Sequence, residues 1–593
     1  MPSHLQTSCD NISPLQISKL HKTFQAGKRS IPALTDLTLT IRSGIVTGLI
    51  GADGAGKTTL MRLASGLLLP DSGTITVLGH DAGHDAAVIQ KMIGYMPQRF
   101  GLYEDLTVQE NLDLYSDLQG MPMKDRAARY RRLMEMTGMA PFTKRLAGRL
   151  SGGMKQKLGL ACTLIRPPKL LFLDEPTVGV DPVSRRELWD IIYHQVENEG
   201  MTVLLSTAYL DEAERCKDVI LLHEGKLLGQ APPQEFSDKL TGQSFEARSS
   251  LHNRRGLQEK LSSSNVVLDA IILGNYVRII TRKSQQGDEL TDLFSTAEEE
   301  VEILAVPPRF EDAFIYLLTS GKTEKFKPPQ HVEKSSQAAT GNNNDAVIIV
   351  RNLQRRFGDF YAVRDLSFAV QRGQIFGLLG ANGAGKSTTF RMLCGLLPAS
   401  DGFLEVAGEN LRTASAKARG RIGYMAQKFS LYAGLSVQQN LRFFSSIYGL
   451  SGKQQKERIR WALETFELQA IRTNISGELP LGFKQRLAMA AALMHEPEIL
   501  FLDEPTSGVD PLARREFWRR INGLAESGVT VLVTTHFMEE AEYCDQLVIM
   551  AEGQVLATGD PQQLKQEQTS KSLPNPTMED AFIALIEQFE DRK

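Results

Sequence analysis

An internal duplication constrains this chain more than any other feature of its sequence, because a long repeat means two copies of one fold. The segment GADGAGKTT at residues 51–59 returns as GANGAGKST at residues 380–388. The segment LLFLDEPT at residues 170–177 returns as ILFLDEPT at residues 499–506. Both pairs stand 329 residues apart. A constant offset over more than a hundred residues predicts a duplicated domain, since a bias of composition would not preserve it.

Composition excludes several classes of protein. The 593 residues carry 67 basic and 70 acidic side chains, a net charge of −3, whereas a general nucleic-acid binder shows a basic excess. We therefore expect no nucleic-acid partner. No uncharged apolar run reaches the roughly 18 residues of a membrane span, and the N-terminus lacks the pattern of a secretory signal. None of the five cysteines forms a CxxC pair, so we expect neither a disulfide framework nor a zinc site.

The repeat also sets the expected domain organisation. The letters EDAF recur with an offset of only 268 residues, so extra residues with the pattern of short strands and a helix follow the first copy. A polar stretch rich in Gly and Asn then reads as a linker. We expect a first α/β domain at 12–240, a small α/β appendage at 241–318, a linker at 319–345, a second α/β domain at 346–570 and a helical tail at 571–593.

Each copy contains a glycine-rich loop of the form GxxxxGK[ST] between an apolar strand and a helix. Such a loop cradles phosphate groups with backbone N–H groups, helped by the helix N-terminus, while the lysine adds a cation and the hydroxyl a Mg²⁺ ligand. The alternative, a glycine-rich turn with a chance lysine, does not account for two copies in the same context. The predicted nucleotide-binding residues are Gly51, Ala52, Asp53, Gly54, Ala55, Gly56, Lys57 and Thr58 in the first copy, and Gly380, Ala381, Asn382, Gly383, Ala384, Gly385, Lys386 and Ser387 in the second.

Two carboxylates end a short apolar strand in each copy. These are Asp174 and Glu175 in the first copy and Asp503 and Glu504 in the second. Beside a phosphate loop, the aspartate can hold the Mg²⁺ shell and the glutamate can orient or deprotonate the attacking water. A role as helix N-caps is the alternative. We expect Thr58, Asp174, Ser387 and Asp503 to hold the metal.

A second anion-binding helix start is predicted at Ser151, Gly152 and Gly153, where a hydroxyl and two glycines precede a helical pattern. A plain helix cap would leave the same pattern.

The ordered set of motifs resembles the nucleotide-binding domains of ABC ATPases over nearly the whole chain, and in particular the fused ATPase subunits of bacterial ABC exporters of the YbhF type. The resemblance implies two P-loop α/β domains, each with a helical subdomain, that sandwich two ATP molecules between the phosphate loop of one domain and the signature motif of the other. It implies that Gln98 and Gln427 sense the γ-phosphate beside the groove for a permease. It also implies that Phe24 and Phe357 stack on adenine, although either could be a core residue.

The two copies depart from the family pattern in an asymmetric way. At the second signature, Pro480 and Leu481 replace Ser151 and Gly152, so a hydroxyl is lost and a side chain is added. In the first copy Ala208 stands where the second has His536, which resembles the switch histidine that contacts the γ-phosphate. In the family's head-to-tail pairing, all these defects fall in one composite site. We expect the loop, Glu504 and His536 of the second copy, with the first signature, to hydrolyse ATP, and the other site to be degenerate while it retains Glu175.

By this resemblance the chain is the ATPase of a bacterial exporter of drugs or other small molecules. The resemblance implies separately encoded permease chains and a location on the cytoplasmic face of the cell membrane. Segments 99–118 and 428–447, with Phe100, Tyr103, Tyr115, Phe429, Tyr432, Phe443 and Phe444, could supply apolar anchors for the permease. The alternatives are the fused ATPase of a sugar importer and a soluble translation factor of the ABC-F class. A translation factor of that class would usually keep both signatures and a charged helical linker.

Overall fold

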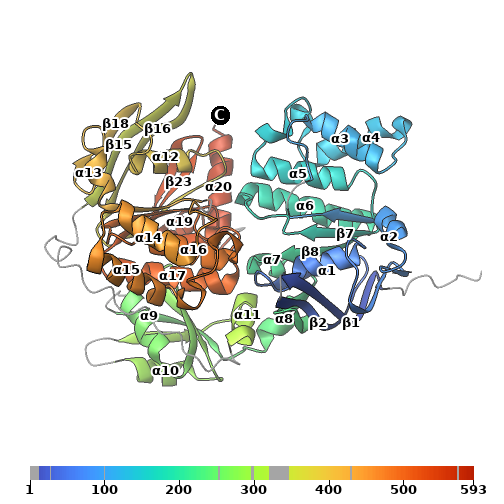
Figure 1. Cartoon of the computed structure of the whole chain (residues 1–593), viewed down its shortest axis with the longest axis horizontal. Helices are drawn as coiled ribbons and strands as arrows, with labels where there is room; N and C mark the ends of the chain where they lie inside the picture. Colours follow the sequence, from blue (N-terminus) through green and yellow to red (C-terminus); the bar gives the residue numbers. More distant parts are fainter. Residues whose placement is uncertain are drawn as a thin grey trace, which may run out of the picture. The chain divides into compact units, whose positions relative to one another are not determined.

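The computed structural model describes residues 13–26, 29–98, 101–250, 254–295, 300–319, 346–427, 430–570 and 573–592. The chain folds as two compact units (Figure 1). The first unit contains Met1–Val180, Ser184–Leu240 and Pro308–Leu318, and the second contains Asp181–Val183, Thr241–Pro307 and Thr319–Lys593. The predicted linker beyond residue 319, Cys9, Phe100 and Phe429 lie outside the described residues.

Two sheets form the framework of the first unit. The smaller is antiparallel, in the order β2 (Arg29–Ile41), β1 (Leu15–Ala26), β4 (Ser72–Val77) and β5 (His80–Asp81). The larger has the order β10 (Lys226–Ala231), β9 (Asp218–His223), β3 (Val46–Gly51), β8 (Thr202–Thr207), β7 (Leu170–Asp174) and β6 (Ile93–Met96). Five of its strands are parallel and β10 is antiparallel. Every residue of β3, β7 and β8 is buried, as continuous apolar strands of a parallel sheet are.

Helices connect these strands. They are α1 (Lys57–Ala64), α2 (Ala86–Met92), α3 (Val108–Leu118), α4 (Met123–Met136), α5 (Gly152–Thr163), α6 (Pro182–Glu199), α7 (Leu210–Glu214), α8 (Pro233–Asp238) and α11 (Phe310–Thr319). A capping box starts α3, in which Thr107 accepts the N–H of Glu110 while the Glu110 carboxylate accepts the N–H of Thr107. The helices α3, α4 and α5 follow one another in the stretch between β6 and β7 and form the helical subdomain (Figure 1).

The second unit repeats the sheets of the first in the same strand order. Its smaller sheet runs β16 (Phe360–Gln371), β15 (Ala346–Phe357), β18 (Asp401–Val406) and β19 (Glu409–Asn410). Its larger sheet runs β20 (Ile422–Met425), β21 (Ile499–Asp503), β22 (Thr530–Thr535), β17 (Ile375–Gly380), β23 (Gln546–Ala551) and β24 (Gln554–Gly559). The family resemblance therefore extends from motifs to topology, and the predicted fold class of two P-loop α/β domains is confirmed.

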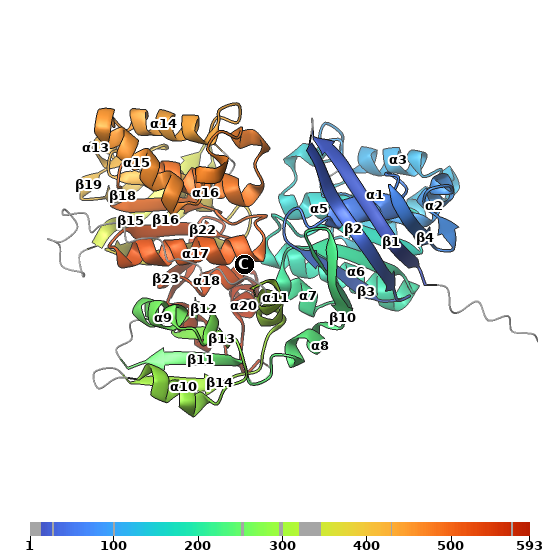
Figure 2. The same cartoon turned by 60° about the horizontal axis from the view of Figure 1, so that its bottom comes forward.

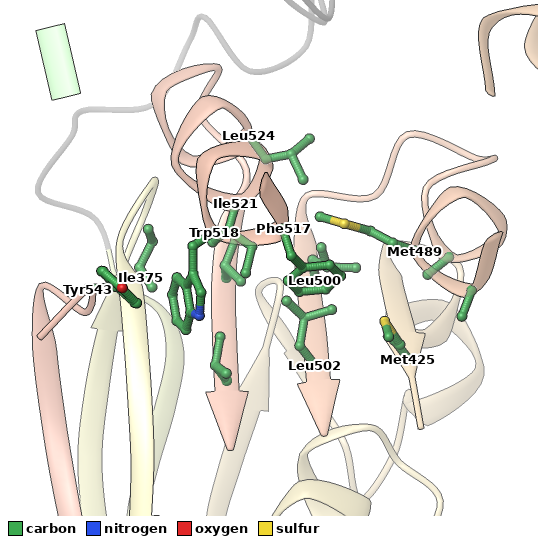
Figure 3. Close-up of a cluster of buried hydrophobic side chains, with 14 of the residues drawn as sticks. Ile375, Met425, Met489, Leu500, Leu502, Phe517, Trp518, Ile521, Leu524 and Tyr543 are labelled. Atoms are coloured by element: carbon green, nitrogen blue, oxygen red, sulfur yellow. The ribbon is translucent and has the colours of Figure 1, made fainter. Parts of the chain in front are cut away.

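The helices of the second repeat lie at corresponding places. They are α12 (Lys386–Leu393), α13 (Ser415–Arg419), α14 (Val437–Ile447), α15 (Gly452–Thr465), α16 (Leu481–Ala492), α17 (Pro511–Glu526), α18 (Met538–Ala541), α19 (Pro561–Glu567) and α20 (Met578–Glu590). Side chains of α17, including Trp518 and Ile521, pack on Leu500 of β21 and neighbouring strands in one buried cluster (Figure 3). This cluster holds the helix that follows the Asp-Glu strand against the sheet.

The residues between the repeats form a small fold of their own (Figure 2). Its elements are β11 (Ser244–Ser249), α9 (Arg254–Ser263), β12 (Val267–Leu273), β13 (Tyr276–Thr281), α10 (Gly287–Phe294) and β14 (Val301–Ala305). The antiparallel strand order β12-β13-β11-β14 is that of a ferredoxin-like βαββαβ unit. Three strands and α10 match the predicted pattern, whereas α9 and β14 were not predicted. Residues 241–307 belong to the second compact unit and 308–318 to the first, although the whole stretch follows the first repeat in sequence.

Among the described helices, none is both long enough and apolar enough to span a bilayer.

Candidate functional site

The glycine-rich loop of each repeat joins a buried strand to a helix. In the first repeat β3 ends at Gly51 and α1 begins at Lys57, and Gly56 has a φ of 101°. A Cβ at Gly56 would lie 2.7 Å from the carbonyl oxygen of Ala33, so neither the backbone angle nor the space admits a side chain. Gly385 has a φ of 98° and the same restriction from Ala362. Each loop therefore requires a glycine directly before its lysine.

The lysine of each loop is buried and lies over the loop itself. Lys57 Nζ donates to the carbonyl oxygen of Gly51 at 2.7 Å and lies 3.4 Å from Glu175 Oε1. Lys386 Nζ donates to the carbonyl oxygen of Gly380, also at 2.7 Å. Burial lowers the pKa of Lys386, while Glu504 acts in the opposite direction. The ammonium therefore stands where the loop would close around a phosphate.

The Asp-Glu pairs lie at the carboxyl ends of the central strands. The backbone turns sharply after each aspartate, with a φ of 50° at Glu175 and 46° at Glu504, a conformation unusual for a non-glycine residue and common at functional sites. In the second repeat Thr534 Oγ1 donates to Asp503 Oδ1 at 2.6 Å and accepts the N–H of Glu504 at 3.0 Å. Ser206 makes the same two contacts in the first repeat. The neighbouring strand thus fixes the aspartate carboxylate and the backbone of the glutamate.

The structure brings the predicted glutamine and glutamate together in both repeats. Gln98 Nε2 donates to Glu175 Oε2 at 2.5 Å, and Gln427 Nε2 donates to Glu504 Oε2 at 2.6 Å. The glutamine follows β6 or β20 and the glutamate follows β7 or β21, two adjacent strands. Each amide therefore orients its carboxylate.

Only the second repeat adds a histidine to this cluster. His536 Nδ1 lies 3.2 Å from Glu504 Oε2, and both side chains are buried. Burial by itself would raise the pKa of Glu504, but His536, Lys386 and Gln427 together hold that pKa below its usual value. Burial raises the pKa of the neighbouring Asp503. The arrangement keeps Glu504 ionised, as a base or an orienting acceptor for water must be.

The first repeat has the same backbone at this place but no imidazole. Ala208 is buried, and the N–H of Tyr209 is donated to Thr207 Oγ1 at 3.0 Å, as the N–H of Phe537 is to Thr535 Oγ1 at 2.9 Å. Ala208 thus occupies the position of His536 in an otherwise equal turn. The sequence alignment of these two residues is confirmed by the shared turn.

Comparison with known proteins agrees with this geometry. The model of the ABC transporter family matches residues 34–178 and 363–507. YbhF of Escherichia coli (strain K12), described as a probable multidrug ABC transporter ATP-binding protein, is 51% identical over 98% of this chain and 99% of its own length. The chain belongs to the ABC transporter family. Its chemistry is that of an ABC-type ATPase.

Two further ABC proteins match a smaller part of the chain. The Nod factor export ATP-binding protein I of Burkholderia lata is 43% identical over 37% of this chain and 72% of its own length. A solved ATP-binding subunit of an ABC transporter is 28% identical, with a TM-score of 0.37, and covers 40% of this chain and 99% of its own.

The ABC signature differs between the repeats at the start of a helix. Ser151 is the N-cap of α5, where its Oγ accepts the N–H of Met154 at 3.3 Å. Pro480 is the N-cap of α16 and makes no side-chain cap, and Leu481 is the first residue of that helix. A Cβ at Gly153 would lie 2.4 Å from Ser184 Oγ, so this glycine lets α5 approach the chain after the Asp-Glu strand. Both repeats form the signature helix, but only the first has a hydroxyl, that of Ser151, at its start.

The predicted adenine-stacking residues lie at the tips of two hairpins. Phe24 is 40% exposed and pairs with Ile31 across the β1–β2 hairpin, and Phe357 is 47% exposed and pairs with Phe360. The guanidinium of Arg355 lies 4.4 Å from the Phe357 ring centroid. Neither phenylalanine is a core residue, and stacking of adenine on these rings stays a prediction.

Two buried glutamates near the site were not predicted from the sequence. Glu212 and Glu540 are completely buried, and each accepts the hydroxyls of two threonines. In the first repeat these are Thr177, after the Asp-Glu pair, and Thr207, before Ala208. Burial raises the pKa of Glu212, opposed by Arg185. The repeated DEAE and EEAE segments at 211–214 and 539–542 were the available signal.

Proposed function

We propose that this chain energises export through a membrane partner by hydrolysing ATP mainly at one site. That site comprises the phosphate loop, Asp503, Glu504 and His536 of the second repeat, and the head-to-tail pairing that the family resemblance implies would add the signature at Ser151. The observation that carries the proposal is the contact of His536 with Glu504, against Ala208 at the equivalent place in the first repeat. The site with Glu175, Ala208 and Pro480 binds ATP and turns it over slowly.

Mg²⁺ is part of this proposal. Asp174 Oδ2 is buried and accepts no hydrogen bond among the described residues, and a carboxylate oxygen left free in this way suits a hard cation. Thr58 and Ser387 stand at the second position of α1 and α12, next to the phosphate-loop lysines. We assign Thr58 with Asp174 and Ser387 with Asp503 to the metal, which would neutralise charge on the phosphates.

The partner we propose is a separately encoded permease, with the chain held at the cytoplasmic face of the membrane. The description of YbhF as a multidrug transporter component supports this assignment. The second repeat offers suitable apolar anchors after Gln427: Tyr432 is exposed, and its ring lies 4.7 Å from that of Phe443. Aromatic anchors of this kind are typical of surfaces that receive a helix.

The test compares two matched variants of the purified full chain. Loss of a general base typically costs 10²–10⁴ in rate, so Glu504→Gln should lower kcat for ATP by at least about 10²-fold. Glu175→Gln should change kcat by less than about threefold, because the first site lacks the imidazole and the partner hydroxyl. Both variants should still bind ATP with Mg²⁺. Equal losses in both variants, or a loss confined to Glu175→Gln, would reject the asymmetric assignment.

A further inference from the structure

The ferredoxin-like unit at 241–307, here called the appendage, is joined to the second repeat by buried charges. Asp269 of β12 forms ion pairs with Arg515 and Arg519 of α17. Asp269 is 5% exposed and Arg515 is 6% exposed. A buried charge left without its partner is costly, so these contacts fix the appendage to one place on α17.

A second group of contacts joins the appendage to the chain between α18 and β23. Arg254 and Arg255 of α9 both pair with Asp545. Gly274, after β12, donates its N–H to the carbonyl oxygen of Glu542 at 2.8 Å. Asp545 Oδ2 also accepts the N–H of Ile375, the first residue of β17, at 2.8 Å. One carboxylate therefore connects α9 to the strand that leads into the phosphate loop.

Apolar packing lies between these two groups of charges. Ile271 and Leu273 of β12 belong to the same buried cluster as Trp518 of α17 and Tyr543. The rings of Trp518 and Tyr543 lie 4.8 Å apart, and Figure 3 shows both beside Ile375. The appendage thus completes the core under the second repeat's sheet.

Each element that the appendage contacts borders a part of the ATP site. The helix α17 begins directly after Asp510, in the loop that follows Glu504. The helix α18 begins two residues after His536, and β17 ends at Gly380. The appendage therefore contacts α17 and the chain after α18 directly, and it reaches the start of β17 through Asp545.

Two of the three charges that receive the appendage are reversed in the first repeat, whereas Arg515 is matched there by Arg186. Asp190 of α6 stands where α17 has Arg519, at the constant offset of 329 residues. Lys217 stands where the second repeat has Asp545, since Asp218 and Gln546, which begin β9 and β23, take the same place in the two sheets. Asp269 would keep one arginine there but meet the like charge of Asp190, and Arg254 and Arg255 would meet the like charge of Lys217. The charges of the second repeat therefore match the appendage better than those of the first.

We propose that the appendage is a positioning domain for the second repeat's ATP site. By fixing α17, α18 and the start of β17, it holds Glu504 and His536 in their hydrolytic arrangement. ATP binding, which depends on the loop and Lys386, does not require it. This inference rests on the proposed function, in which the second repeat carries out hydrolysis.

The test is made in the full chain. It first reverses the charges on the appendage and then the charge on the second repeat that they contact. Arg254→Glu with Arg255→Glu places two carboxylates against Asp545 and should release the appendage, seen as faster amide hydrogen exchange in β12 and α9. Because misplacement of catalytic groups by about 1 Å can cost 10²-fold, kcat should fall by about tenfold or more. KM for ATP should stay within about twofold of the wild-type value, since the phosphate loop is untouched.

Rescue distinguishes positioning from general damage. Adding Asp545→Lys to the double variant restores opposite charges, and the first repeat shows that this fold accepts lysine there. Both the slow exchange and kcat should return. The matched control, Lys217→Asp in the first repeat, should leave kcat unchanged. Unchanged exchange, release of the appendage without loss of kcat, or a recovered interface without recovered kcat would each overturn the proposal. Glu504→Gln and Glu175→Gln, assayed in parallel, report separately on which repeat hydrolyses ATP.

Discussion

At position 495 the second repeat has a histidine whose ionisation the fold opposes. The His495 ring stacks on Tyr448 with centroids 3.7 Å apart, and its Nε2 lies 3.0 Å from the carbonyl oxygen of Ile422. A carbonyl only accepts, so Nε2 carries the proton of the neutral ring. Among the described residues Nδ1 has no partner. Burial lowers the pKa of His495 to about 4. This histidine joins the loop after α16 to the start of β20.

The stability of the second repeat should therefore fall in mild acid. The unfolded chain binds the proton of His495 with a pKa near 6.5 and the folded chain with a pKa near 4, so the stabilisation is complete above pH 6.5 and is lost as the pH falls toward 4. At pH 4.5 the loss should be roughly 2–3 kcal/mol. His495→Gln keeps a donor for Ile422 but does not titrate. Thermal melts from pH 8 to 4.5 should show wild type losing its advantage over this variant; parallel curves would contradict the assignment.

At the scale of secondary-structure elements, the two repeats differ most clearly at the start of the signature helix, which is α5 in the first and α16 in the second. Ser151 caps α5, whereas α16 begins after Pro480 without a side-chain cap. Ser151→Ala should cost about 1 kcal/mol of stability through the unpaired N–H of Met154. It should also lower kcat by about 10²-fold or more if its hydroxyl serves the transition state. Pro480→Ala is the matched control and should change kcat by less than about twofold, since no cap is lost. Similar kcat values for the two variants would refute the role of Ser151.

The strands, loops and helices that carry the site were predictable because their sequence motifs consist of neighbouring residues. The phosphate loop is a run of adjacent residues in which a glycine, whose φ is near 100°, directly precedes the lysine. The two carboxylates directly follow an apolar strand. Both patterns occur twice in the sequence, which makes them easier to recognise. The surface of the second repeat that the appendage contacts has no such local sequence pattern. Asp269 and Arg515 are 246 residues apart, and an isolated aspartate in a strand does not indicate which surface it meets. The contacts of Glu212 and Glu540 were not predicted either, because the repeated DEAE and EEAE segments do not show which of their acids is buried.

At the scale of the whole molecule, duplication within one chain explains how one site could lose groups that the other keeps. Two identical subunits must carry the same substitution at both sites, whereas here each repeat occurs once and can change separately. In the first repeat Gln98 still donates to Glu175 and Lys57 to the carbonyl oxygen of Gly51, as their counterparts do in the second. The site that we propose to be degenerate therefore lacks particular groups in an intact framework, and those groups could be restored.

The decisive whole-chain prediction is the repair of the degenerate site. In the Glu504→Gln background, the combined changes Ala208→His, Pro480→Ser and Leu481→Gly return the imidazole, the cap hydroxyl and the bare helix start. The turn at Thr207 already matches that at Thr535, so the new histidine should take the place that His536 holds beside Glu504. Each recovered transition-state donor is worth about 10²–10³ in rate, so kcat should rise at least about tenfold over Glu504→Gln alone. Adding Glu175→Gln should abolish the gain, because the repaired site would then lack its carboxylate. A gain that survives that addition would mean that turnover does not depend on Glu175, and no gain at all would mean that these three positions are not what separates the two sites.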